Sequence, residues 1–147
     1  PSRPATLSEL PKIISDALSI QPSEVYKARD YLLIYNSEED IAKLKVSASI
    51  LEAIDTSPGG IITSAKGHTV DFVSRFFAPD KGINEDPVTG SAHAAIGPYW
   101  AERLGKPKLK AYQASERGGV LYLNIKEDRL NISGHAFTYM KSTISLP

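Results

Sequence analysis

The sequence predicts an α+β fold in which strands precede and follow a single long apolar helix. Residues 91–104 are rich in alanine and are followed by Gly105, a natural helix stop, which predicts that helix. Flanking segments such as residues 70–77 have the apolar content and turn boundaries of strands. Hydrophobic residues make up 41% of the 147 residues, so residues 1–147 are expected to form a single domain with its own core.

The amino-terminal part is expected to contain one helix followed by two short strands. A helix is predicted at residues 9–19, with Ser8 as its cap and apolar side chains along one face. Pro11 then falls in the first turn, where its missing N–H costs little. Residues 25–28 and 31–35 flank Arg29 and Asp30 and are predicted to form a hairpin or two separate short strands.

The middle of the chain combines short helices with a turn. Ser37 and Asp40 have capping-box spacing, which predicts a helix at residues 38–44, and a second helical piece is expected at residues 48–54. Residues 57–60, Ser-Pro-Gly-Gly, are predicted to be a turn. The segments expected to be strands after this turn are 61–65, 70–77, 107–113, 119–126, 129–133 and 136–146.

The most informative segment is the run Asn-Glu-Asp-Pro-Val-Thr-Gly-Ser-Ala-His at residues 84–93, directly before and into the long helix. Gly90 lets a ligand approach the backbone closely, and Ser91 is a candidate helix cap. The unpaired N–H groups and positive dipole end of the first turn favour an anion. Asp86 could then handle a proton on the same ligand. Alternatively, Thr89 or Ser91 simply caps the helix and Asp86 belongs to a turn.

A longer pattern of motifs surrounds this segment. In order, it comprises Ser-Arg-Phe-Phe-Ala-Pro at 74–79, Glu-Asp-Pro-Val-Thr-Gly-Ser-Ala-His at 85–93, Pro-Tyr-Trp at 98–100, Gln-Ala-Ser-Glu-Arg-Gly-Gly at 113–119 and Ile-Ser-Gly-His-Ala at 132–136. This order and spacing resembles the phenazine-biosynthesis PhzF-like family, whose fold is shared with diaminopimelate epimerase. The resemblance is strong over residues 71–138. It implies a barrel-like, mostly antiparallel sheet wrapped around a central helix formed by residues 92–104.

The resemblance also implies roles for individual residues. The family uses an aspartate at the position of Asp86 near the reacting carbon, and a Gly-Ser pair, here Gly90 and Ser91, to hold a substrate carboxylate. Thr89 and His93 are assigned to the same substrate-binding site. His93 lies in the first helical turn, where it either faces the site or packs against the sheet. A purely structural loop-capping role for Asp86 stays open as the alternative.

Other polar residues near the motifs have structural interpretations. Glu85 is expected to point away from the site if the loop is extended. Arg117 is expected in a turn, with contact to an anionic substrate as the alternative. His68 and His135 each follow a glycine and suit turns or strand starts, and the histidines lack metal-site spacing. Ser91 has no histidine–acid pairing in the pattern, which argues against a hydrolase triad.

Composition excludes several classes of function. Lys and Arg together number 17, as do Asp and Glu, so no net charge recruits nucleic acid or an anionic membrane. The basic segment 106–110 is interpreted as a solvated strand edge. We expect neither a membrane span nor a signal sequence. The absence of cysteine excludes disulfides and thiolate metal ligands and suits a cytoplasmic protein. It also excludes the cysteine pair by which diaminopimelate epimerase exchanges protons. We expect no metal and no cofactor.

The resemblance covers only part of what the family requires. PhzF-like proteins contain two similar halves with the active site between them, and the amino-terminal half supplies the general acid/base glutamate and a Gly-His cradle. Neither is found here, so the chain is interpreted as the carboxy-terminal half of a PhzF-like isomerase or epimerase. Its expected chemistry is cofactor-independent proton transfer on a small carboxylate-bearing metabolite. Its expected partner is the missing half or a second copy, as a homodimer, and alone it should be inactive. The alternative is a non-catalytic anion-binding or assembly domain.

Overall fold

A computed structural model describes residues 1–2, 4–56 and 59–145. Its strands form one eight-stranded sheet whose spatial order follows the sequence. The strands are β1 (Thr6–Leu7), β2 (Glu24–Lys27), β3 (Tyr31–Ile34), β4 (Ile61–Lys66), β5 (Phe72–Phe77), β6 (Lys108–Gln113), β7 (Gly119–Lys126) and β8 (Arg129–Ser133). Neighbouring strands pair antiparallel except for β3–β4 and β5–β6, which are parallel. The expected hairpin is therefore confirmed as β2–β3.

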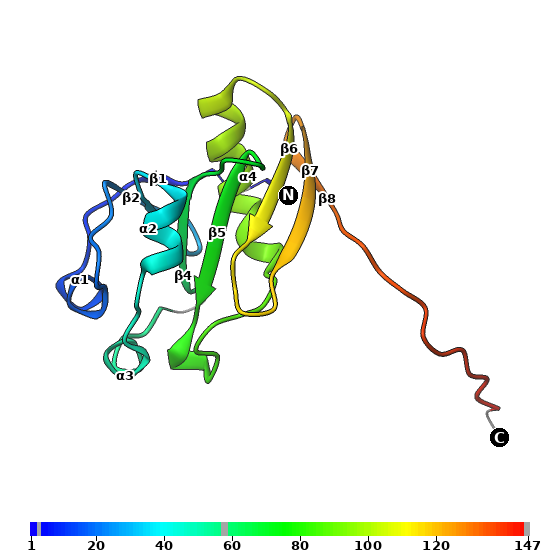
Figure 1. The fold of residues 1–147 in the computed structure, drawn as a ribbon, viewed down its shortest axis with the longest axis horizontal. Coiled ribbons are helices and arrows are strands. Elements are labelled where there is room, and N and C mark those ends of the chain that lie inside the picture. Colours follow the sequence, from blue (N-terminus) through cyan, green and yellow to red (C-terminus); the bar gives the residue numbers. More distant parts are fainter. Residues whose placement is uncertain (3, 57–58, 146–147) are drawn as a thin grey trace.

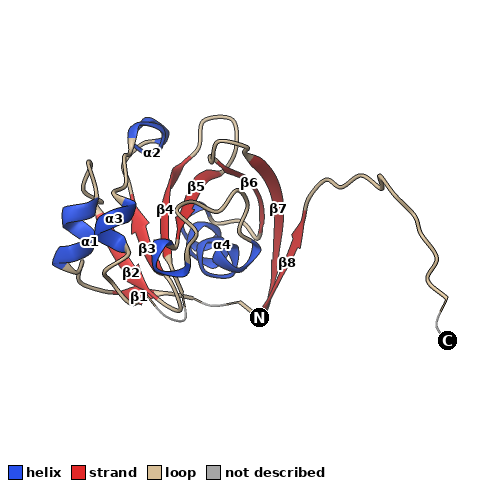
Figure 2. Ribbon diagram, turned by 90° about the horizontal axis from the view of Figure 1, so that it is seen from below, coloured by secondary structure: helices blue, strands red, loops and turns tan. Residues whose placement is uncertain are grey.

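The sheet curves around one long helix, and shorter helices lie outside it. The helices are α1 (Lys12–Ala17), α2 (Glu38–Lys43), α3 (Ala48–Leu51) and α4 (Gly90–Leu104), with a short 3-10 turn η1 (Pro79–Lys81). Figure 2 shows α4 inside the curve formed by β4–β8. The sheet does not close on itself, because its end strands β1 and β8 are not paired with each other. The predicted α+β fold with a barrel-like, mostly antiparallel sheet around a central helix is thus confirmed.

Two apolar clusters hold these layers together. The inner one lies between α4 and the concave face of the sheet. There Phe72 stacks on Trp100 with ring centroids 5.9 Å apart, and the indole N–H of Trp100 donates to Ser64 Oγ at 2.9 Å. The outer cluster packs α1, α2 and α3 on the other face. Because successive strand residues face opposite sides, Val73 belongs to the outer cluster while its neighbour Phe72 belongs to the inner one.

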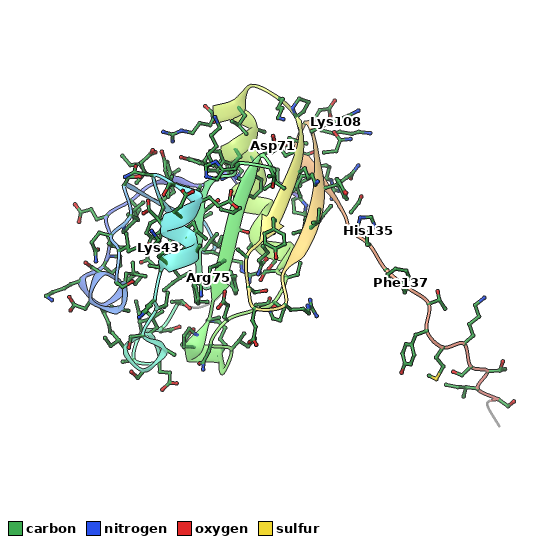
Figure 3. All side chains as sticks on the ribbon, in the orientation of Figure 1. Lys43, Asp71, Arg75, Lys108, His135 and Phe137 are labelled. Atoms are coloured by element: carbon green, nitrogen blue, oxygen red, sulfur yellow. The ribbon has the colours of Figure 1, made fainter. Side chains whose placement is uncertain are left out.

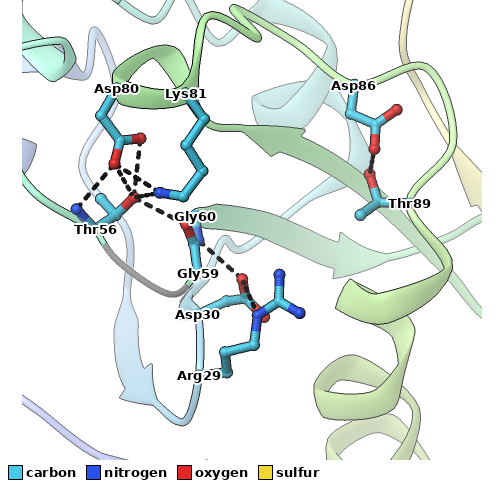
Figure 4. A network of polar contacts seen from close by, with 9 residues as sticks. All are labelled: Arg29, Asp30, Thr56, Gly59, Gly60, Asp80, Lys81, Asp86 and Thr89. Atoms are coloured by element: carbon cyan, nitrogen blue, oxygen red, sulfur yellow. Dashed lines mark hydrogen bonds and ion pairs between the residues drawn. The ribbon is translucent and has the colours of Figure 1, made fainter.

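Polar contacts fix the loops at one end of the sheet (Figure 4). The buried carboxylate of Asp30 accepts the backbone N–H of Gly60 at 2.8 Å, which ties the β2–β3 turn to the start of β4. Asp80 in η1 accepts both the backbone N–H and the hydroxyl of Thr56, and Lys81 donates to Asp80 at 2.6 Å. These bonds hold the start of the segment that leads from β5 to α4.

Several boundaries differ from the predicted ones. Helix α1 begins at Lys12 with Pro11 as its N-cap, because Ser8 donates its backbone N–H to Val25 and extends the pairing of β1 with β2. The capping box of Ser37 and Asp40 is confirmed, and α2 follows it. Helix α3 is shorter than predicted. The predicted turn at 57–60 lies partly outside the described residues, which omit 57 and 58.

The carboxy-terminal segment was also predicted wrongly. Residues 136–145 form no strand, while residue 146 lies outside the described residues. They form an extended arm that leaves the body after β8 (Figures 1 and 3) and exposes the apolar side chains of Phe137, Tyr139, Met140 and Ile144. The lysines of segment 106–110 are exposed, as expected for a solvated strand edge, and β6 pairs with β5 only from Ala111 onward. Within the described residues, no helix is long and apolar enough to cross a membrane.

Candidate functional site

The loop between β5 and α4 is anchored by an ion pair beneath it. Arg75, on β5, contacts Glu85 through two nitrogens, at 2.7 and 2.9 Å. The same guanidinium donates to the backbone carbonyls of Leu44 at 2.7 Å and Ile41 at 3.2 Å. A planar donor suits this arrangement of carboxylate and carbonyls. Glu85 therefore has the structural role predicted for it, and its side chain is directed into this pair.

Asp86 lies beside the carboxy-terminal end of β5, where its backbone N–H and its carboxylate each form a hydrogen bond. Its N–H donates to the carbonyl of Phe76 at 3.0 Å, so the loop runs alongside the strand that it has just left. The hydroxyl of Thr89 donates to Asp86 Oδ2 at 2.7 Å (Figure 4). The carboxyl group is thus fixed at one oxygen, one residue before Pro87 and four residues before the helix.

Gln113 joins this loop to the sheet. It ends β6 and is buried. Its Oε1 accepts the backbone N–H of Thr89 at 2.8 Å, and its Nε2 donates to the carbonyl of Asp86 at 2.6 Å and to the hydroxyl of Thr89 at 3.1 Å. Sequence reasoning missed this role, although a glutamine at the start of the motif at residues 113–119 was a usable signal.

The amino terminus of α4 is open. The helix begins at Gly90, and Thr89 is its N-cap residue without a side-chain capping bond. Ser91 lies inside the first turn and is not the cap, contrary to the prediction. Both Gly90 and Ser91 are exposed. A methyl group added at Gly90 would meet no atom within 4 Å, so nothing within the described residues requires glycine there.

An open helix start of this kind can hold an anion. The amides of the first turn have no intrahelical acceptor, and the helix dipole adds partial positive charge. The Gly90 backbone can be approached closely because no side chain covers it. The arrangement therefore places a carboxylate, Asp86, beside a group of free donors, which is suited to a ligand that carries both an anion and an exchangeable proton.

His93 lies beneath this surface. Its ring is fully buried against Phe72, with centroids 5.9 Å apart, and its Nδ1 bonds to the carbonyl of Thr89 at 2.7 Å. Burial lowers the pKa of the imidazole, and the bond to Thr89 opposes this shift in part. His93 packs inside the curve of the sheet. It does not reach the exposed surface of Gly90 and Ser91, so the packing alternative describes its position.

The turn at 115–118 supports the loop from the other side. Ser115 donates its hydroxyl to the carbonyl of Pro87 at 2.7 Å and accepts the N–H of Gly118 at 3.0 Å. Gly118 has a φ of 69°, which favours glycine. Arg117 is exposed and, with Glu85, Pro87, Ser115 and Glu116, lines a recess of about 420 Å³. It lies in a turn, as expected, and its side chain borders the loop that carries Asp86.

Of the other histidines, His135 lines a recess together with Val88 of this loop and Arg117. His68 contacts Glu39 at 2.9 Å on the surface. His135 packs edge-on against Tyr122 at the start of the arm, and Figure 3 shows it beyond the sheet. Among the described residues, no three His, Asp or Glu side chains are grouped so that they could bind a metal ion.

Comparison with known proteins identifies the family. Residues 4–142 match the PhzC-PhzF family, described as phenazine biosynthesis-like protein. The chain belongs to this family. The resemblance that the motifs at residues 74–136 indicated is thereby confirmed.

Relatives of this PhzF-like chain come from bacteria and mammals. It is 46% identical over 139 residues to an uncharacterized isomerase of Halalkalibacterium halodurans, covering 92% of this chain and 52% of the relative. It is 38% identical over 121 residues to a human phenazine biosynthesis-like domain-containing protein, covering 76% and 42%. A crystal structure of a PhzF-family protein from Enterococcus faecalis superposes with a TM-score of 0.86 at 42% identity, covering 93% and 52%. The chain spans about half the length of these proteins.

Proposed function

We propose that this chain is the carboxy-terminal half of a PhzF-like isomerase or epimerase that moves a proton on a small carboxylate-bearing metabolite without a cofactor. The observation that carries the proposal is the placement of Asp86 beside the open amino terminus of α4. Relatives that carry the name isomerase support the reaction class. A cytoplasmic location completes the proposal, supported by the absence of cysteine.

The role proposed for each residue follows from how exposed that residue is to solvent. Gly90 and Ser91 hold the substrate carboxylate and stabilise negative charge that develops on it. Asp86 positions the substrate or assists the proton, while a glutamate from the companion half is the principal acid/base. Thr89 and His93 support the substrate-binding surface from below it, because their side chains are buried: Thr89 is 6% exposed and His93 is 0% exposed. Solvent deuterium uptake by a small carboxylate, with and without the companion half, tests the proposal.

An anion should bind where α4 begins. We expect sulfate or malonate to shift the amide resonances of residues 89–93 in an NMR titration, because donors and dipole converge there. Gly90→Val should weaken binding more than Ser91→Ala does, since a branched side chain blocks approach to the backbone whereas Ser91→Ala removes a single hydroxyl. Gly90→Ala is a useful intermediate, because the site has room for a methyl group within the folded chain.

The control for this titration is Lys12→Ala, on the opposite face of the sheet in α1, which should leave binding unchanged. If no amide between Thr89 and His93 responds to either anion, the α4 terminus is not a binding site. The proposal that it holds a carboxylate would then be wrong.

A non-catalytic assembly domain is the second candidate function, and the exposed arm favours it. Phe137 is 95% exposed and Tyr139 is 93% exposed, which is unusual for aromatic side chains. The distinction is experimental. An assembly domain would bind its partner and an anion, yet the assembled protein would show no proton exchange, whereas the isomerase would exchange protons only when assembled.

The chain is expected to self-associate when the companion half is absent. A second copy is the available cover for the exposed apolar arm, giving a twofold dimer. Sedimentation equilibrium at micromolar concentration should show a dimer that dissociates on dilution, and Phe137→Ser with Tyr139→Ser should weaken it by tenfold or more. Lys141→Ser, on the same arm, is the control. A single monomeric species that does not change with concentration would contradict this prediction.

A further inference from the structure

The hydrogen bonds around Gln113 determine the direction of the one at Asp86. The amide nitrogen of Gln113 can only donate, and it donates to Thr89 Oγ1 at 3.1 Å. The hydroxyl of Thr89 has a single proton, which cannot point back at that donor. It is directed to Asp86 Oδ2, at 2.7 Å. The order of donation is therefore Gln113 to Thr89 to Asp86.

The other contacts of Gln113 make this direction rigid. Its Oε1 accepts the Thr89 N–H at 2.8 Å, which fixes which end of the amide is oxygen. The Asp86 carbonyl accepts from Nε2 at 2.6 Å, so an amide turned by 180° would place two acceptors together. Gln113 is 1% exposed and Thr89 is 6% exposed, so water does not readily replace these bonds.

We propose that Gln113 is the positioning residue of this site, setting the Thr89 hydroxyl so that Asp86 presents a fixed carboxylate to the ligand. The inference rests on the proposed function, because it concerns the same aspartate. Oδ2 is occupied by Thr89, and among the described residues no donor contacts Oδ1. This arrangement leaves Oδ1 as the oxygen available to the proton of a bound metabolite.

The test separates orientation of Asp86 from general stability. Thr89→Val removes the hydroxyl at nearly constant volume, Thr89→Ser retains it, and Gln113→Met removes the amide. The readouts are the Hα–Hβ couplings of Asp86 by NMR, which report its side-chain rotamer, and the affinity for malonate. A double-mutant cycle between Thr89→Val and Gln113→Met measures whether the two residues act through one another.

We expect the wild type and Thr89→Ser to show one Asp86 rotamer, and Thr89→Val and Gln113→Met to show averaging. Malonate affinity should fall about tenfold in Thr89→Val and in Gln113→Met, because each variant loses the charge-assisted hydrogen bond from Thr89 to Asp86. The double variant should lose little more, because the same bond cannot be lost twice. A fixed Asp86 rotamer in folded Thr89→Val would overturn the inference, as would additive losses in the cycle. If the rotamer effect appears but malonate does not bind even to the wild type, the positioning role stands and the proposed function fails.

Discussion

Replacing Arg75 with methionine should lower the free energy of unfolding by about 3 kcal/mol. The change leaves Glu85 without its cation and leaves the carbonyls of Leu44 and Ile41 without this donor. The side chains of Arg75 and Glu85 are 16% and 25% exposed, so water compensates only in part. Figure 3 shows Arg75 at the middle of β5, where its loss affects both α2 and the loop that carries Asp86. Urea denaturation followed by circular dichroism measures the effect.

The matched control is Arg103→Met near the end of α4. Arg103 also pairs with a glutamate, Glu24, at 2.7 Å, but its side chain is 48% exposed. An exposed pair contributes at most about 1 kcal/mol, so this variant should be much less destabilised. Equal losses in the two variants would show that the Arg75 pair is no more than a surface contact and does not anchor the loop.

Local sequence patterns predicted the elements that depend on neighbouring residues. The capping box of Ser37 and Asp40 needs only residues three apart, and it formed as predicted. The α4 helix and its stop at Gly105 are likewise set by local propensity. The predicted strands on either side formed because their apolar faces meet α4 or the outer helices.

Predictions failed where distant residues decide the outcome. Ser8 was expected to cap a helix, but its backbone bonds to Val25 in the neighbouring strand region. The segment 136–146 has strand-like alternation, yet residues 136–145 have no neighbouring strand to supply backbone hydrogen bonds. A strand requires a partner, and the sequence pattern of the segment alone does not supply one.

The sequence predicted only those parts of the candidate site that lie close together in the chain. The motif located Asp86, Gly90 and Ser91 in sequence, and the fold places them around the start of α4. The motif could not locate Gln113 as their support, because Gln113 is 24 residues from Thr89 and reaches it only through sheet pairing. His93 shares the motif but points inward, since residues on successive positions of a helix face different sides.

The chain alone should show no isomerase turnover. Its described residues place the carboxylate of Asp86 beside one helix terminus, and the proposed principal acid/base is a glutamate of the companion half. A carboxylate that both removes and returns the proton would not be expected to change configuration at a carbon. Asp86 is therefore expected to contribute only when a companion half brings its glutamate.

Solvent deuterium uptake measures whether this chain needs a companion half to move a proton on a carboxylate. A panel of small carboxylates is incubated in D2O with the 147-residue chain, with a companion half taken from a full-length relative, and with both, and deuterium at carbon is followed by NMR. We expect uptake only when both halves are present, and loss of uptake with Asp86→Asn. Uptake catalysed by the chain alone, and abolished by Asp86→Asn, would contradict the claim that this chain carries half of an active site.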